Sequence, residues 1–116
     1  MVYWLYERRV RTMTNHTIIK TTFPDKASAK AAARLLIERR LAACVQLLPI
    51  ESVYSWQGEI CEEQEILLLI KTKAERFSEV AAAIKQIHTY EVPEIVQVPI
   101  VGGNHEYLSW IDDCTN

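Results

Sequence analysis

Hydrophobic and polar positions follow strand-like and helix-like patterns in turn from Thr17 onward. Residues 17–23 are rich in β-branched and aromatic side chains, which is typical of a strand, and Pro24 ends it. Asp25 is then placed to cap a helix that ends near Arg40. The apolar positions of this helix recur at i, i+3, i+4 and i+7, and they are Ala29, Ala32, Ala33, Leu36 and Ile37.

A long hairpin is predicted next. Residues 41–56 form its first strand, and Pro49 indicates an edge strand or a bulge because proline cannot donate to a sheet ladder. Gln57 and Gly58 predict a turn, and residues 59–72 return as the second strand. The second strand begins with a mostly polar half, so we expect the hairpin to extend beyond the core as an arm.

The remaining elements complete an alternating pattern. Thr72 and Glu75 have the spacing of a capping box and predict the start of a second helix. A strand over residues 94–101 follows, with Pro99 marking an edge, and Asn104 is the expected N-cap of a last helix. The apolar faces of these two helices are predicted to comprise Phe77, Val80, Ala81, Ile84 and Ile87, and Tyr107, Trp110, Ile111 and Cys114, respectively.

This order predicts an α+β fold, a ferredoxin-like βαββαβ sandwich with an additional C-terminal helix, an antiparallel sheet and a long hairpin. The helices of such a sandwich cover only one face of its sheet. Residues 66–70 are continuously apolar, however, which indicates burial on both faces. We therefore expect the second face to be covered by further copies of the chain, the alternative being that the last helix alone covers it.

Length and charge narrow the class of protein. The 116 residues suffice for one domain, which we assign to residues 13–116. Residues 1–12 are interpreted as an appendage, with Met13 as a possible natural start. They do not resemble a signal peptide, because their apolar stretch is too short and their arginines follow it. A net charge of −2 argues against nucleic-acid binding, and no apolar run is long enough to span a membrane. Three cysteines without a CxxC pair favour a reducing compartment, so we expect a cytoplasmic protein.

Catalytic and phosphate-binding motifs are absent from the sequence, and no enzyme activity is predicted. The three glycines allow no GxGxxG or Walker loop, and no GxSxG or HExxH occurs. Cys44 and His88 are the side chains best suited to copper or another divalent cation. By spacing alone, however, a cysteine in the context of Cys44 is more often a buried core thiol, and a histidine placed as His88 is more often a cap at a helix C-terminus.

Two further groups of residues carry candidate chemistry. Glu59, Cys61 and Glu63 share one face of the arm at a period of two, as either metal ligands or a solvated surface. Charged and aromatic side chains also suit a cleft, which would serve as a small-ligand pocket or, as we favour, an oligomer interface. The members of this second group are Lys71, Tyr90, Glu94, Tyr107 and Trp110.

Five ordered motifs resemble the CutA divalent-cation-tolerance proteins. They are LAACVQLLP (41–49), YSWQG (54–58), LLLIKT (67–72), HTYEVPEIVQVPI (88–100) and EYLSWI (106–111). The resemblance covers nearly all of residues 17–111. It implies a ferredoxin-like subunit that forms a tight homotrimer similar to PII signalling proteins, with a role in copper and heavy-metal tolerance.

The resemblance also implies functional residues. The proposed copper ligands of the family fall on Cys44 and His88, and a further cysteine found in some members falls on Thr21, a poor ligand for soft copper. Cys61 is a possible substitute for that missing cysteine. The implied inter-subunit cleft comprises Glu63, Lys71, Tyr90, Glu94, Tyr107 and Trp110.

These observations favour a trimeric protein of metal homeostasis that binds copper(II) or another divalent cation and has no enzymatic role. The alternative is a PII-like signalling module that binds a small effector or a partner protein in the inter-subunit cleft. An acid–base enzyme using the carboxylates of the cleft is a third hypothesis, which requires a strongly shifted pKa beside a polar cavity.

Overall fold

The computed structural model describes residues 14–116, so the predicted appendage lies outside the described residues. In this part of the chain no helix is long and apolar enough to cross a membrane. The elements in chain order are β1 (His16–Phe23), α2 (Lys26–Glu38), β2 (Cys44–Trp56), β3 (Glu59–Lys73), the 3-10 turn η1 (Ala74–Arg76), α3 (Phe77–Ile87), β4 (Val96–Pro99) and α4 (His105–Cys114).

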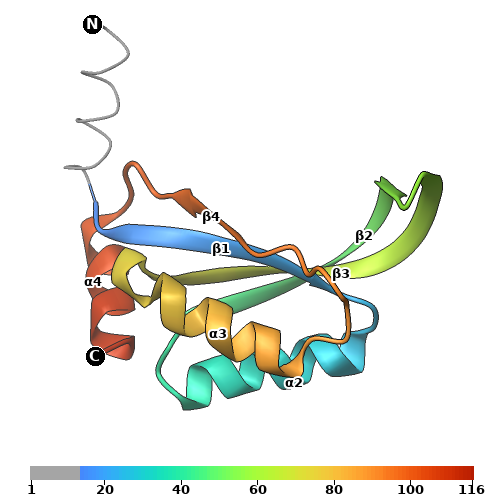
Figure 1. The fold of residues 1–116 in the computed structure, drawn as a ribbon. Coiled ribbons are helices and arrows are strands. Elements are labelled where there is room, and N and C mark those ends of the chain that lie inside the picture. Colours follow the sequence, from blue (N-terminus) through green and yellow to red (C-terminus); the bar gives the residue numbers. More distant parts are fainter. Residues whose placement is uncertain (1–13) are drawn as a thin grey trace, which may run out of the picture.

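The four strands form one antiparallel sheet in the order β2-β3-β1-β4, with α2 and α3 side by side on one face (Figure 1). The predicted ferredoxin-like α+β arrangement with an additional C-terminal helix is therefore confirmed. β2 and β4 are the two edge strands, and they contain Pro49 and Pro99. Both prolines thus stand where a missing N–H does least harm to the ladder.

The core lies between the sheet and the two helices. Ile19 of β1 is opposite Ile70 of β3, which in turn is opposite Val45 of β2, so these side chains share one face. Small residues of α2, including Ala29 and Ala32, bring this helix close to the sheet, and all four of Ile19, Ile70, Ala29 and Ala32 are fully buried. The predicted apolar stripe of α2 is confirmed except at Ile37, which is exposed.

Two of the three predicted helix caps are confirmed. The Asp25 carboxylate accepts from the backbone N–H of Ser28 at 2.8 Å, and the Asn104 side chain accepts from the N–H of Glu106 at 2.9 Å. The capping box at Thr72 is wrong, because β3 continues to Lys73 and the buried Thr72 hydroxyl donates to the carbonyl of Leu41. A side chain that faces the core of a sheet is not available to cap the following helix.

Several predicted boundaries and apolar faces also differ. β2 begins at Cys44 instead of Leu41, because Arg40 adopts a left-handed φ of 57° and the next residues turn back toward the sheet. β4 begins at Val96, because its pairing with β1 starts only there. Ile87, Tyr107 and Trp110 are exposed, Cys114 is half-buried and only Ile111 of the last helix is fully buried, so the apolar faces are narrower than their spacing predicted.

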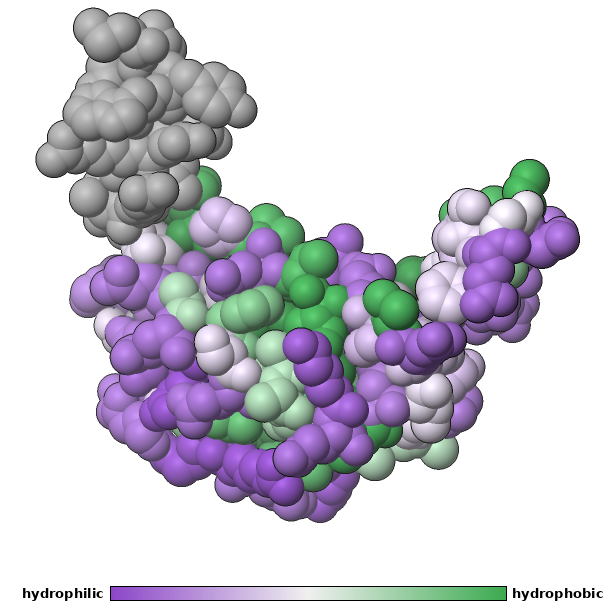
Figure 2. Space-filling view, viewed as in Figure 1, coloured by the Kyte–Doolittle hydropathy of each residue, from purple (hydrophilic) through white to green (hydrophobic). Residues whose placement is uncertain are grey.

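The face of the sheet opposite α2 and α3 is called the open face below. By strand register it carries Ile18, Lys20, Cys44, Leu48, Leu67, Leu69, Lys71, Val96 and Val98. Leu48 is 50% exposed, Val96 46% and Val98 48%. Figure 2 shows apolar surface along β4 and the chain that leads to it, above the hydrophilic surface of the helices. α4 lies at one end of the sheet (Figure 1), so the alternative that this helix alone covers the open face is wrong.

The hairpin arm, residues 50–65, extends beyond the sheet. β3 pairs with β1 only from Ile66 onward, whereas its pairing with β2 continues to Trp56 and Glu59. Figure 1 shows the arm curving away from the helices. Its tip is a two-residue turn in which Gln57 and Gly58 both have positive φ, 50° and 80°, as the twist of a tight hairpin requires. The predicted arm and turn are confirmed.

Candidate functional site

The structure does not bring Cys44 and His88 together within one chain. Cys44 lies on the open face opposite Lys71, at one end of the β2–β3 ladder. His88 stacks on Phe23, which is opposite Ile66 and faces the core. Five residues of β3 separate these two points, about 16 Å at the rise of a strand. The two predicted ligands therefore lie on opposite faces of the sheet, toward opposite ends.

His88 is held at the C-terminal end of α3 by contacts to both ring nitrogens. Its Nδ1 accepts the backbone N–H of Tyr90 at 3.1 Å, and its Nε2 contacts the carbonyl oxygen of Thr22 at 2.5 Å. Since a carbonyl can only accept, the Nε2 carries a proton and the ring is in one defined tautomer. The imidazole also stacks on Phe23, with ring centroids 4.4 Å apart. His88 thus joins β1 to the loop after α3, and neither nitrogen offers a free lone pair.

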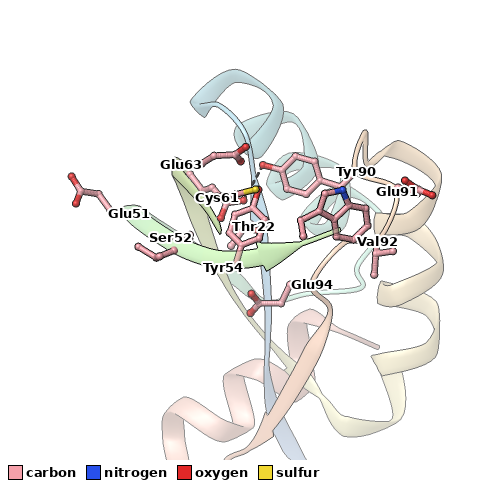
Figure 3. Close-up of a pocket in the computed structure, with 13 residues that line it drawn as sticks. Thr22, Glu51, Ser52, Tyr54, Cys61, Glu63, Tyr90, Glu91, Val92 and Glu94 are labelled. Atoms are coloured by element: carbon pink, nitrogen blue, oxygen red, sulfur yellow. Dashed lines mark hydrogen bonds between the residues drawn. The ribbon is translucent and has the colours of Figure 1, made fainter. Parts of the chain in front are cut away.

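The base of the hairpin arm forms a cavity of about 740 Å³ with the loop after α3, and this arm-base cavity is the candidate functional site (Figure 3). Alternate residues of β3 (Cys61, Glu63 and Glu65) and residues 51–54 and 56 of β2 line it from the arm, and residues of the segment 90–94 line its other side. Its lining consists of Thr22, Glu51, Ser52, Val53, Tyr54, Trp56, Cys61, Glu63, Glu65, Tyr90, Glu91, Val92 and Glu94.

Glu65 and Tyr90 join the two sides of the arm-base cavity. The Tyr90 hydroxyl donates to Glu65 Oε2 at 2.9 Å, and Glu65 is only 8% exposed. Burial alone would raise the pKa of Glu65, but hydrogen bonds from Ser52, Tyr90 and Thr22 outweigh it and leave this pKa below its usual value. Burial and the bond to Glu65 raise the pKa of Tyr90. At neutral pH the pair is therefore a carboxylate and a neutral phenol.

The rest of the lining gives the cavity a negative potential. A hydrogen bond to the Glu63 carboxylate, together with burial, raises the pKa of Tyr54 to about 12. Five glutamates line the cavity, and its lining contains no lysine, arginine or histidine. Figure 3 shows Glu63 and Glu94 on either side of Tyr54, whereas Glu51 and Glu91 are directed away from the centre.

A second cluster joins α4 to the sheet at the end near Cys44. The Lys71 ammonium lies 3.4 Å from the Tyr107 hydroxyl and 5.4 Å from the centre of the Tyr107 ring. Tyr107 and Trp110 contact each other with ring centroids 5.5 Å apart, and both are exposed. In one chain, the residues predicted for a single cleft thus divide into Glu63, Tyr90 and Glu94 in the arm-base cavity and the Lys71 cluster at the other end.

Sequence reasoning missed part of the arm-base cavity. Glu65 continues the period-two series of Glu59, Cys61 and Glu63, so alternation alone was sufficient to place it on their face. The predicted two-residue turn fixes the register of the hairpin and places Trp56 opposite Glu59, on the same face as Cys61 and Glu63. Glu51 is opposite Gln64, at a position of the other face, so alternation does not place it in the cavity. Cys61 lies in the cavity beside Glu63 and away from Cys44.

No cluster of three or more His, Cys, Asp or Glu side chains with the geometry of a metal site occurs among residues 14–116. Thr21, which stands where some relatives were expected to have a cysteine, is fully buried on the core face, and its hydroxyl has no hydrogen-bond partner there. His16 is occupied by Asp112, with 2.9 Å between Nε2 and Oδ1. The side chains that the structure describes in one chain therefore do not converge on a metal ion.

Comparison with known proteins identifies the family to which this sequence is similar. The family model of the CutA1 divalent ion tolerance protein matches residues 17–114. The divalent-cation tolerance protein CutA of Thermus thermophilus is 46% identical over 99 residues, which are 84% of this chain and 96% of that protein. The protein CutA of Homo sapiens is 41% identical over 95 residues, which are 81% of this chain but only 53% of the longer human protein.

Solved structures agree with this relationship. The periplasmic divalent cation tolerance protein CutA from Archaeoglobus fulgidus superposes with a TM-score of 0.86 at 39% identity, over 87% of this chain and 99% of that chain. CutA from Xylella fastidiosa gives a TM-score of 0.86 at 40% identity, over 89% and 100% of the two chains. Sequence and fold lead to the same conclusion: the chain belongs to the CutA1 divalent ion tolerance protein family.

Proposed function

We propose that this chain acts as a homotrimer that binds a divalent cation, copper(II) foremost, and so contributes to tolerance of such ions. Membership of a divalent ion tolerance family is the observation that carries the proposal. A thiol and an imidazole are ligands that suit copper and related ions. The chemistry of Cys44 and His88 is thus consistent with the family.

The open face supports assembly into a trimer. Leu48, Val96 and Val98 are each about half exposed on this face, which also carries Ile18, Leu67 and Leu69. Patches of this kind on a small protein are typical of interaction sites. Burial against two further copies would remove this surface from water. The number three follows from the similarity to trimeric members of the family.

Assembly also bears on the metal site. Cys44 lies on the open face, where a second copy would contact it, and His88 of the same chain is remote from it. We therefore propose that the ion is shared between copies, with Cys44 supplying a thiolate. His88 would contribute only after exchanging its contact with Thr22 or Tyr90 for the ion.

Calorimetric titration of copper(II) tests this function. Cys44→Ser and His88→Ala are each expected to weaken copper binding at least tenfold, because each substitution removes one proposed ligand of the ion. Cys114→Ser is the matched control, since Cys114 is another half-buried thiol but belongs to α4. Binding curves that are indistinguishable between the wild type and both ligand variants would contradict the proposed site.

A second candidate function, an effector-binding module similar to PII proteins, is favoured by the arm-base cavity. Its volume of about 740 Å³ is in the range of small-molecule sites. Acid–base catalysis finds no support there, since the buried Glu65 has a lowered pKa and a general acid needs a raised one. We therefore propose a binding role without catalysis.

The cytoplasmic location stays a prediction. It rests on an odd number of cysteines, all of which are free in the structure. The relative from Archaeoglobus fulgidus is described as periplasmic, and the relative from Oryza sativa as chloroplastic, so members of the family occupy more than one compartment.

A further inference from the structure

The open face carries a lysine among apolar side chains. Lys20 belongs to β1, which is hydrogen-bonded to β3 on one side and to β4 on the other, and in these pairings it is opposite Leu69 and Val96. Ile18, which precedes it on the same face of β1, is apolar as well. Lys20 is half-buried among these neighbours in a single chain. A positive charge therefore lies in the middle of a mainly apolar surface.

Lys20 has no carboxylate partner in the part of the chain that the structure describes. The ion pairs found there involve His16, Arg34, Lys73 and Arg76. None of the residues that define the open face is acidic. A charge that enters an interface without an opposite charge is costly, because it loses its contact with water. A copy that covers the open face is therefore favoured if it brings a carboxylate to Lys20.

The hairpin arm is the acidic part of the chain. Residues 41–70 contain five glutamates and no lysine, arginine or histidine. By alternation, Glu59, Glu63 and Glu65 lie on the side of the arm that continues the open face. Tyrosine hydroxyls of the same chain already bond to Glu63 and Glu65. Glu59, opposite Trp56 at the tip of the arm, is exposed and takes part in none of the ion pairs that the structure describes.

Lys20 and Glu59 cannot meet within one chain. Leu69, which is opposite Lys20, and Glu59 are ten residues apart on β3, about 33 Å at the rise of a strand. Figure 1 shows the arm leading away from the rest of the sheet. A contact between these two side chains therefore joins two copies. Each copy then offers a negative arm tip and a positive sheet centre, and such a head-to-tail contact can close into a ring.

We propose that Lys20 of one copy forms an ion pair with Glu59 of the next copy, and that this pair fixes where the arm docks on the open face. The proposal rests on the trimer of the proposed function and names the charges that direct its assembly. Ion pairs in an interface contribute to the choice of partner and register more than to affinity. Cys44 and the arm-base cavity take no part in this contact.

Cross-linking with a carbodiimide tests the contact directly, because this reagent joins an amine to a carboxylate only where the two touch. Mass spectrometry of the cross-linked wild type is expected to show a peptide in which Lys20 is joined to Glu59, a link that one chain cannot form. Lys30 is the matched control within the same sample, since it is an exposed lysine of α2, on the other side of the sheet. It is expected to form no link to Glu59.

Exchange of the two charges tests their contribution to assembly. Lys20→Glu and Glu59→Lys are each expected to weaken trimer association about tenfold or more, because each places two like charges together. The variant that carries both substitutions should associate within about threefold of the wild type, since the ion pair is restored with reversed polarity. Sedimentation velocity over a dilution series in moderate urea measures the association.

The outcomes separate this proposal from the trimer itself. A wild type that sediments as a single chain would overturn both. A wild-type trimer that yields no Lys20–Glu59 peptide, or single variants that associate as tightly as the wild type, would overturn the ion pair and leave the trimer standing. A double variant that associates no better than the single variants would likewise show that the two charges do not meet.

Discussion

At the scale of single residues, the contacts of His88 decide what it can do. A histidine that binds a metal needs one free nitrogen, but Tyr90 and Thr22 occupy both nitrogens of this ring. Its stacking on Phe23 adds packing to these polar contacts. Replacing His88 would therefore first weaken the packing between β1 and residues 88–90. Because this structural effect could itself alter copper binding, the titration also includes Cys44→Ser.

The Tyr90–Glu65 pair allows a prediction about pH. Tyr90→Phe removes the hydroxyl that donates to Glu65 and is expected to lower the free energy of unfolding at pH 7 by about 1 kcal/mol. The pKa of Glu65 is lowered in the folded state, so the stabilisation is complete above its ordinary value of 4.5 and is lost as the pH falls through the folded pKa. The difference between the variant and the wild type should therefore shrink as the pH falls below 4.5. Urea denaturation across this pH range measures both quantities.

Tyr107→Phe is the control for this experiment, because its hydroxyl contacts Lys71 and not a carboxylate. It should change stability only slightly and without a dependence on pH between 3 and 7. A Tyr90→Phe difference that stays constant over the same range would show that Glu65 does not respond to this hydrogen bond.

At the scale of elements, periodicity predicted which face of a helix is buried and failed where tertiary contacts compete for one side chain. The core face of α2 follows from spacing, because its apolar stripe packs into the core that the sheet and α3 complete. Thr72 and Glu75 matched a helix start, but β3 competed for Thr72 and buried it against Leu41. The acidic face of the arm was predicted from alternation. The arm-base cavity also depends on how closely residues 90–94 approach the arm, and the sequence does not specify the distance between these two segments.

The hairpin turn gives a prediction at this scale. Gly58 has φ +80°, and a Cβ added there would meet nothing within 4 Å, so any penalty comes from the backbone alone. Gly58→Ala is therefore expected to lower the free energy of unfolding by about 1 kcal/mol in urea denaturation. Gly103→Ala is a useful comparison, since Gly103 lacks a positive φ and its added Cβ would lie 3.4 Å from a flexible Leu108 side chain. Equal effects of the two substitutions would argue against backbone strain at the turn.

At the scale of the whole molecule, a single chain buries its core but leaves the open face of its sheet partly exposed. α2 and α3 cover the face that carries Ile19 and Ile70, and both side chains are fully buried. On the open face, α4 reaches only the end near Lys71, and the valines of β4 stay half exposed. The hairpin arm likewise has strand edges without partners beyond the end of β1. A trimer would use both features, because the arm of one copy can extend over the sheet of the next.

Val98→Glu tests this assembly directly. Val98 is 48% exposed at the centre of β4, so a glutamate there remains solvated in a single chain but becomes a buried charge in an interface. Sedimentation velocity at micromolar concentration should give three chains for the wild type and a single chain for Val98→Glu. Ile37→Glu, an apolar-to-acidic change at a 42% exposed position of α2, should remain trimeric, since α2 lies on the other side of the sheet. A wild type that sediments as one compact chain, or an Ile37→Glu variant that dissociates as readily as Val98→Glu, would contradict assembly through the open face.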